Sequence, residues 1–96
     1  YKLNYNNNEI EILIKRGEEF YIRCKEDKAI YFYKNALFIA SNLKDYGKII
    51  EIHDRLSNCY CDANNFGAAI KELNKSEEIL IKVENQNNVH ENYCPS

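Results

Sequence analysis

Apolar side chains recur every three to four positions along most of the chain, with polar residues between them. This spacing places the apolar side chains on one face of an α-helix. Nowhere do apolar and polar residues alternate with the period of two that indicates a β-strand. The pattern therefore predicts an all-α chain with four amphipathic helices, at about 8–24, 27–42, 46–63 and 66–83.

Each of these helices has an apolar face that we expect to be buried. The second is apolar over a wide arc, which is typical of a helix that is covered on more than one side. The residues expected to be buried are Ile10, Leu13, Ile14, Gly17, Phe20, Tyr21 and Cys24 in the first helix; Ala29, Ile30, Phe32, Tyr33, Ala36, Leu37, Ile39 and Ala40 in the second; Ile49, Ile50, Ile52, Leu56, Cys59 and Tyr60 in the third; and Ala69, Ile70, Leu73, Ile79 and Leu80 in the fourth.

The pattern also repeats itself at a spacing of 40 residues. Small residues coincide with small ones and aromatic residues with aromatic ones when the chain is shifted by this distance. A repeat of this length is typical of a unit that buries its apolar face by stacking on a copy of itself. The matched pairs include Gly17 and Ser57, Phe20 and Tyr60, Ala29 and Ala69, Ile30 and Ile70, and Ile39 and Ile79.

The repeat divides the chain into a flank at 1–8, a first unit at 9–43, a second unit at 44–83 and a polar tail at 84–96. The flank and the tail are rich in Asn and lack a pattern, so we expect them to be frayed or disordered. Asp27 and Asp45 are predicted to cap the second and third helices, and Asn64–Asn65 to form a turn. The chain contains no Met, and we interpret it as an excised fragment.

Small residues predict how the helices meet. Gly17 lies in a helix interior, where it costs about 1 kcal/mol relative to Ala, so we expect it to serve a close approach of two helices. Short turns make neighbouring helices antiparallel, and the expected architecture is two stacked helical hairpins. Tyr31 and Phe38 are expected to pack between the repeats. The last helix would keep one bare face, covered by a capping segment or further repeats elsewhere, or by self-association.

Composition and charge exclude several function classes. The net charge is −2 with both signs interspersed, whereas a protein that binds nucleic acid would show a basic excess. No apolar run approaches the roughly 20 residues of a membrane span. The four cysteines are too sparse for a disulfide scaffold, and free thiols in a cytoplasmic protein are the simpler interpretation.

No catalytic or metal-binding motif is present. Cys59 and Cys61 lie two positions apart, which on a helix places them on different sides, and His53 and Cys24 add no ligand spacing. A Cys59–His53 dyad has no helical reason to converge. We therefore expect no metal, no cofactor and no enzymatic activity.

The repeated residues resemble the tetratricopeptide repeat, in the 40-residue variety of spindle-orientation scaffolds and kinesin light chains. That family has a small residue and an aromatic on its first helix, followed by an Ala, a large residue and a small one on its second. Its usual repeat is 34 residues long, and the Pro that commonly ends a repeat is absent here. The matching residues are Gly17, Phe20, Ala29, Tyr33 and Ala36 in the first unit and Ser57, Tyr60, Ala69, Leu73 and Ser76 in the second.

The resemblance implies that the first helix of each hairpin lines a concave face that holds a peptide. Asn58 matches an Asn that often bonds the ligand backbone in this family. The face implied here is acidic, with Tyr21 and Ile22 as apolar anchors, and favours a basic or amphipathic peptide. The residues implied on it are Glu18, Tyr21, Ile22, Glu51, Asp54, Arg55, Asn58 and Asp62, together with Glu11, Ile14 and Cys61.

The leading functional hypothesis is therefore a non-enzymatic protein–protein interaction module, a short segment of a larger scaffold or adaptor. The alternative is a structural element that self-associates through its uncovered helix faces as a homo-oligomer. The acidic face is also open to a third interpretation, as plain solvated surface.

Overall fold

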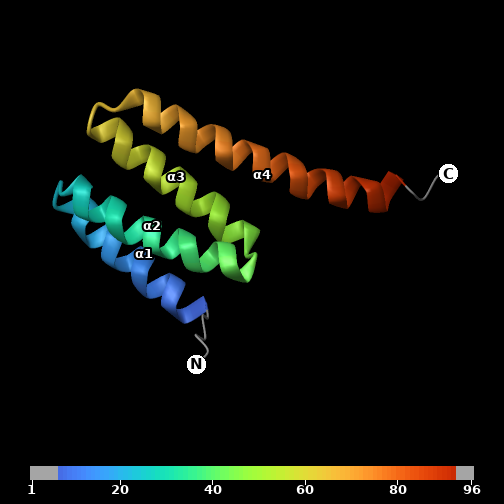
Figure 1. Ribbon diagram of the computed structural model, residues 1–96, viewed down its shortest axis with the longest axis horizontal. Helices are drawn as coiled ribbons and strands as arrows, with labels where there is room; N and C mark the ends of the chain where they lie inside the picture. The colour runs from blue at the N-terminus through green and yellow to red at the C-terminus, as the bar shows by residue number, and fades with distance from the viewer. Residues whose placement is uncertain (1–6, 93–96) are drawn as a thin grey trace.

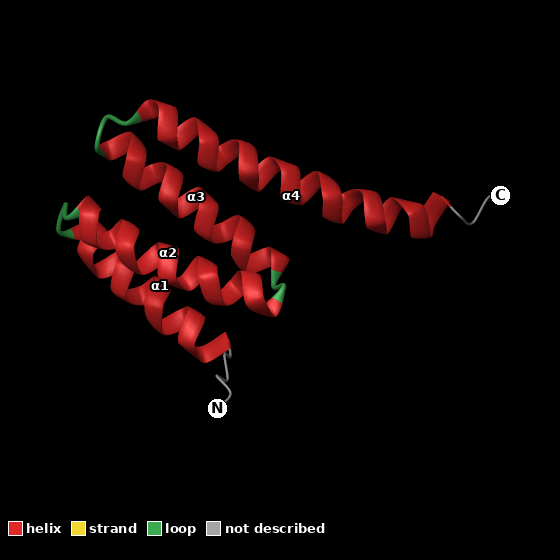
Figure 2. Cartoon of the chain, viewed as in Figure 1, coloured by secondary structure: helices red, strands yellow, loops and turns green. Residues whose placement is uncertain are grey.

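The chain folds into four α-helices joined by short turns (Figure 1). A computed structural model describes the backbone of residues 7–92 and the side chains of residues 8–85. The helices are α1 (Asn7–Ile22), α2 (Glu26–Leu43), α3 (Tyr46–Asp62) and α4 (Phe66–Asn92). No strand occurs in the described part (Figure 2), and the predicted all-α class is confirmed.

The helix ends agree with the periodicity except at two places. α2 begins at Glu26, so Asp27 lies inside its first turn, and the prediction that Asp27 caps the helix is wrong. The cap predicted at Asp45 is confirmed, since its side chain accepts a hydrogen bond from the Lys48 backbone N–H at 3.3 Å. α4 continues to Asn92, well past the predicted end near Val83, because no Gly or Pro interrupts residues 68–92.

The repeat of 40 residues is present in the backbone itself. Cys24 and Asn64 occupy equivalent places in the α1–α2 and α3–α4 turns, and both have a φ of 62°. The Cys24 N–H donates to the Tyr21 carbonyl at 3.0 Å, and the Asn64 N–H donates to the Cys61 carbonyl at the same distance. The next bonds also correspond: Lys25 N–H to Phe20 O at 2.9 Å, and Asn65 N–H to Tyr60 O at 2.7 Å.

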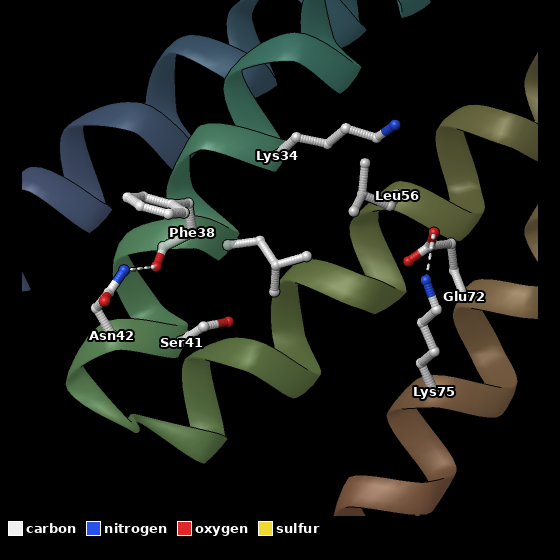
Figure 3. Close-up of a pocket in the computed structure, with 8 residues that line it drawn as sticks. Lys34, Phe38, Ser41, Asn42, Leu56, Glu72 and Lys75 are labelled. Carbon is white, nitrogen blue, oxygen red and sulfur yellow. Dashed lines mark hydrogen bonds and ion pairs between the residues drawn. The ribbon is translucent and has the colours of Figure 1, made fainter.

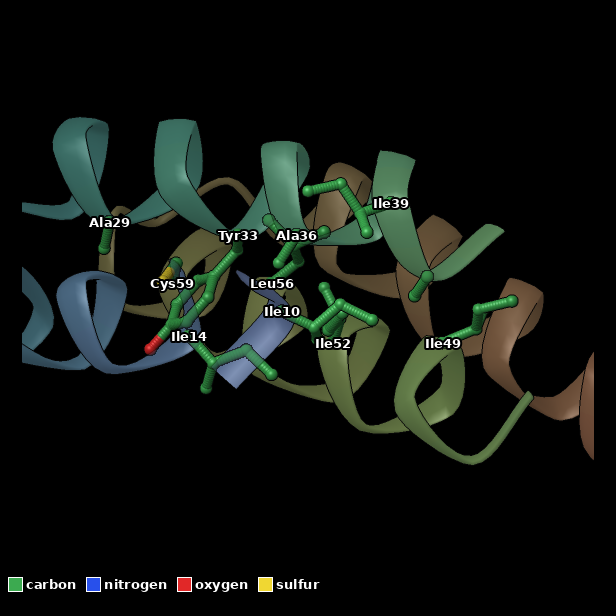
Figure 4. Packing of buried hydrophobic residues seen from close by; sticks show 11 residues of the cluster. Ile10, Ile14, Ala29, Tyr33, Ala36, Ile39, Ile49, Ile52, Leu56 and Cys59 are labelled. Atoms are coloured by element: carbon green, nitrogen blue, oxygen red, sulfur yellow. The ribbon is translucent and has the colours of Figure 1, made fainter. Parts of the chain in front are cut away.

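The helices pack as two antiparallel hairpins, α1 with α2 and α3 with α4, and α2 joins them by packing against α3. The core lies among α1, α2 and α3 (Figure 4). The small residues predicted at the helix contacts, Ala29, Ala36 and Ser57, are buried. The fully buried large side chains are Ile10, Tyr33, Ile52, Leu56 and Cys59.

The close approach predicted at Gly17 is confirmed, and its partner is Tyr33. A β-carbon added to Gly17 would lie 2.5 Å from Tyr33 Cε1 and 2.7 Å from Cδ1. Tyr33 is only 1% exposed, so its ring has no free space to move into. Gly17 therefore lets the first hairpin close over a large aromatic residue.

Several residues predicted to be buried are exposed instead. Ile70, Leu73 and Leu80 of α4 lie open to solvent because no helix of the described chain packs on that side. Cys24 is exposed in the α1–α2 turn. Tyr31 is exposed as well and contacts Phe32 of its own helix, so its predicted packing between the repeats is wrong. Phe38 is partly exposed and lines a cavity between α2 and α4.

Candidate functional site

The first helices of the two hairpins, α1 and α3, share a surface that we call the α1–α3 face. It is defined by the ion pairs that cross between these helices and by the exposed side chains beside them. The residues that sequence reasoning assigned to peptide binding are Glu18, Tyr21 and Ile22 on α1 and Glu51, Asp54, Arg55, Asn58 and Asp62 on α3.

One crossing ion pair joins Glu11 of α1 to Lys48 of α3. Lys48 Nζ also lies 3.5 Å from Glu51 Oε1 within its own helix. The hydrogen bond from Lys48 holds the pKa of Glu11 below its usual value, and that of Lys48 is raised in turn. Because both side chains are partly exposed, we expect salt to screen this pair.

A second junction, with similar exposure, is built on Arg55. Its Nη1 donates to Glu18 Oε2 of α1 at 2.5 Å, and its Nε donates to Glu51 Oε2 at 3.1 Å. The guanidinium also interacts with the hydroxyl of Tyr33, whose ring covers Gly17. Burial opposes the charge of Arg55, but these three partners outweigh it and raise its pKa. Arg55 therefore ties all three helices of the core together.

Tyr21 and Asp62 form a third link between α1 and α3. The Tyr21 hydroxyl donates to the Asp62 carboxylate, and this bond, with partial burial, raises the pKa of Tyr21 to about 12. The two residues that sequence reasoning placed on one face are thus brought together. Tyr21 remains half-buried, and Asp62 is exposed.

The pairing changes the charge of the α1–α3 face. Glu11, Glu18 and Glu51 are engaged by Lys48 and Arg55, so the face is less acidic than its carboxylate count suggests. Sequence reasoning gave Lys48 no role, although its spacing of seven from Arg55 places both cations on one side of α3.

The side chains left open on this face are few. Ile22 is 78% exposed, and Asp54, Asn58, Cys61 and Asp62 are exposed too. Ile14 is a correction: the resemblance implies that it faces the ligand, but it is buried in the core. A large aliphatic side chain at that position stays with the apolar cluster.

Sequence reasoning missed a cavity of about 510 Å³ between α2 and α4 (Figure 3). Leu37, Phe38 and Leu56 give it apolar walls, and Lys34 and Lys75 lie at opposite sides on α2 and α4. The signal in the sequence that corresponds to this cavity is the wide apolar arc of α2. Such an arc extends beyond the surface that one neighbouring helix covers.

A buried pair at this cavity joins α3 to α4. His53 Nδ1 lies 2.6 Å from Glu72 Oε1, and both side chains are almost fully enclosed. Lys75 Nζ lies 4.0 Å from the other carboxylate oxygen of Glu72. This pair satisfies polar groups inside the second hairpin and thereby fixes the register of its two helices.

The thiols are free at Cys24, Cys59 and Cys61, while Cys94 lies outside the described residues. Burial, with Asp62 and Glu26 adding to it, raises the pKa of Cys59 to about 11. Among residues 8–85, no three His, Cys, Asp or Glu side chains are grouped so that they could hold a metal ion. No helix within 7–92 has the length and apolar composition needed to cross a membrane.

Comparison of the chain with protein-family models, with curated proteins and with solved structures gives no match.

Proposed function

We propose that the chain is a non-enzymatic protein–protein interaction module that holds a peptide on the α1–α3 face. The observation that carries the proposal is that ion pairs join the two helices of that face and leave other side chains beside them exposed. Ion pairs from Lys48 and Arg55 cross between two hairpins and connect their first helices. Ile22, Asp54 and Asn58 remain exposed beside them. A surface whose charged side chains are already paired favours binding by the side chains left open, because less order must be gained when a ligand arrives.

The open side chains indicate the chemistry of the peptide. Ile22 offers an apolar contact, and the Asn58 amide offers both a donor and an acceptor for a peptide backbone. Asp54 and Asp62 are the carboxylates not engaged by Lys48 or Arg55. A peptide with an apolar side chain and a basic residue is complementary to this set. The resemblance to tetratricopeptide repeats supports the same placement.

Selection from a displayed random-peptide library tests this function. We expect enrichment of basic or amphipathic peptides, and at least about a tenfold loss of affinity in Asn58→Ala. Asn74→Ala is the matched control, since Asn74 is an exposed Asn on α4, away from this face. If no peptide is enriched, or if both variants lose affinity equally, the proposed function is wrong.

Self-association through uncovered faces is the second candidate function. The exposed Leu73 and Leu80 of α4 favour it, because monomeric proteins seldom leave apolar rows uncovered. Sedimentation at micromolar concentration separates the two candidates. A monomer excludes self-association and leaves the peptide-binding function standing.

A further inference from the structure

The cavity of about 510 Å³ between α2 and α4 has no part in the function proposed for the α1–α3 face. Three helices line it, with Leu56 of α3 between the residues of α2 and those of α4. Pockets that hold small molecules have volumes of about 300–1,000 Å³, mainly apolar walls and a few polar groups that fix the ligand. This cavity lies within that range of volume, and its lining has both components.

The apolar part of the lining is formed by Leu37, Phe38 and Leu56. Leu56 is fully buried, so it belongs to the floor of the cavity. Leu37 is partly buried, whereas Phe38 is 59% exposed although it is a large aromatic residue. An apolar body placed in the cavity removes surface of these side chains from water. Each CH2 group that is buried in this way strengthens binding by up to about fourfold.

Two lysines supply the positive charge of the cavity, Lys34 from α2 and Lys75 from α4. Figure 3 shows the Lys34 side chain extending toward Leu56 and the Lys75 side chain extending toward Glu72, while the ring of Phe38 lies at the other end. Lys75 Nζ is 4.0 Å from Glu72 Oε2, which is a long ion pair. Within residues 8–85, Lys34 takes part in no ion pair. Both ammonium groups can therefore bind an anion.

The buried carboxylate of Glu72 limits how much negative charge a ligand can carry. Its Oε1 lies 2.6 Å from His53 Nδ1, and its side chain is only 10% exposed, so the carboxylate is held at the cavity wall. Two ammonium groups face one carboxylate here, which leaves one positive charge in excess. A singly charged anion balances that excess, whereas a dianion such as a phosphate monoester would be repelled by Glu72.

The polar groups are distributed so that they orient such a ligand. The ammonium groups lie at the end of the cavity where Leu56 and Glu72 are, away from the ring of Phe38. At the Phe38 end, the Asn42 amide already donates its hydrogen bond, from Nδ2 to the Phe38 carbonyl at 2.8 Å. A negative charge is therefore attracted to the lysine end, and an apolar body extends toward Phe38.

We propose that the cavity between α2 and α4 binds a small monocarboxylate with an apolar body. The carboxylate lies between the ammonium groups of Lys34 and Lys75, and the body packs against Leu37, Phe38 and Leu56. Because the ligand contacts residues of both hairpins, its binding stabilises the folded chain. This site is separate from the α1–α3 face, and it is occupied whether or not a peptide is bound there.

Isothermal titration calorimetry of the 96-residue chain with octanoate tests the proposal. We expect saturable binding with a Kd below about 1 mM. Butyrate, which is four CH2 groups shorter, should bind at least about tenfold more weakly. The uncharged 1-octanol has the same hydrocarbon body, and it should bind at least about fivefold more weakly than octanoate because it lacks the charge that the lysines attract.

A double variant with Lys34→Gln and Lys75→Gln should weaken octanoate binding at least about tenfold. The matched control is a double variant with Lys71→Gln and Lys82→Gln, since these two lysines are exposed on α4 and do not line the cavity. It lowers the net charge by the same amount and should bind within about twofold of the unaltered chain.

Phe38→Ala should weaken octanoate binding at least about fivefold, because it removes the aromatic wall. Tyr31→Ala is its control, since Tyr31 is an exposed aromatic residue of the same helix outside the cavity lining. Asn58→Ala should bind octanoate normally. That result keeps the test independent of the peptide-binding function proposed for the α1–α3 face.

The proposal is overturned if octanoate does not bind, if 1-octanol binds as tightly, or if the two double lysine variants bind alike. Amide shift changes in nuclear magnetic resonance spectra locate the bound octanoate. Changes centred on Lys34, Phe38 and Lys75 support the proposal. Changes centred on Leu73 and Leu80 would show adsorption to the exposed apolar side of α4, and they would overturn it.

Discussion

The ring of Tyr33 lies directly over Gly17, so close that a β-carbon at Gly17 would come within 2.9 Å of three of its carbons. This contact decides how near α1 approaches α2. It also directs the Tyr33 hydroxyl to Arg55, and through Arg55 to Glu18 on α1. A single small residue thereby connects the packing of the first hairpin to the ion pairs of the α1–α3 face.

Gly17→Ala should destabilise the chain even though Ala is the better helix former. The added carbon overlaps a buried ring, and such overpacking costs about 1–3 kcal/mol, against a gain of up to about 1 kcal/mol in helix propensity. We expect a net loss in the free energy of unfolding by urea. Gly67→Ala is the matched control, because nothing lies within 4 Å of its added carbon. It should be neutral or stabilising, and a stabilising Gly17→Ala would contradict the packing described here.

Arg55→Gln should lower the free energy of unfolding by about 1–2 kcal/mol, because it removes bonds to two carboxylates and to Tyr33. A double-mutant cycle with Glu18→Gln should give a coupling energy that is retained in part at about 1 M salt, since the Arg55 guanidinium is also bonded to the buried Tyr33. Lys48→Gln is the comparison, and its smaller effect should fade as salt is raised. Equal salt sensitivity of the two pairs would refute the distinction between them.

The pair of Glu11 and Lys48 predicts a pH dependence with a definite sign. The pKa of Glu11 is lower in the folded chain than its ordinary value of 4.5, so the pair stabilises the fold above that pH. The contribution is lost as pH falls through the folded-state pKa. The unaltered chain should therefore unfold at higher urea concentration than Glu11→Gln at neutral pH, and the difference should shrink steadily as the pH is lowered below 4.5. If the stability difference between the two chains instead grows as the pH falls, the ionised Glu11 does not stabilise the fold. That result would contradict the ion pair described here.

The cysteine thiols should differ in how readily they are modified in the folded chain. Cys59 is buried with a pKa of about 11, so almost none of it is thiolate at neutral pH. In the Cys94→Ser variant, Ellman's reagent should modify Cys24 and Cys61 in the folded chain, and Cys59 only after urea is added. Rapid modification of Cys59 without denaturant would mean that the core opens far more readily than its packing indicates.

Periodicity and small residues were enough to predict the hairpins. The helix spacing gives four helices, and Gly17 marks the tight contact because a helix interior tolerates Gly poorly without a packing reason. The extension of α4 was not predictable from periodicity, since the polar residues after Val83 carry no apolar face to follow. The pattern predicts Ile70, Leu73 and Leu80 in the core because it shows that a face is apolar but not whether a neighbour covers it.

The candidate site was predicted less completely than the fold. The resemblance places Tyr21 and Asp62 on one face, and the structure brings them into contact, but the hydrogen bond between them is not a prediction of the sequence. Charge pairing between α1 and α3 depends on how the two hairpins are rotated against each other, which a single sequence does not specify. The sequence therefore gives no sign of the role of Lys48, and it predicts a more acidic face than the structure has.

The central claim is that the α1–α3 face binds peptide, and nuclear magnetic resonance of the isotope-labelled chain tests it most directly. A peptide from the library selection is titrated in, and amide shift changes are followed residue by residue. We predict that the largest changes cluster at Ile22, Asp54 and Asn58. Changes that cluster instead at Phe38 and Lys75, around the cavity between α2 and α4, would contradict the claim.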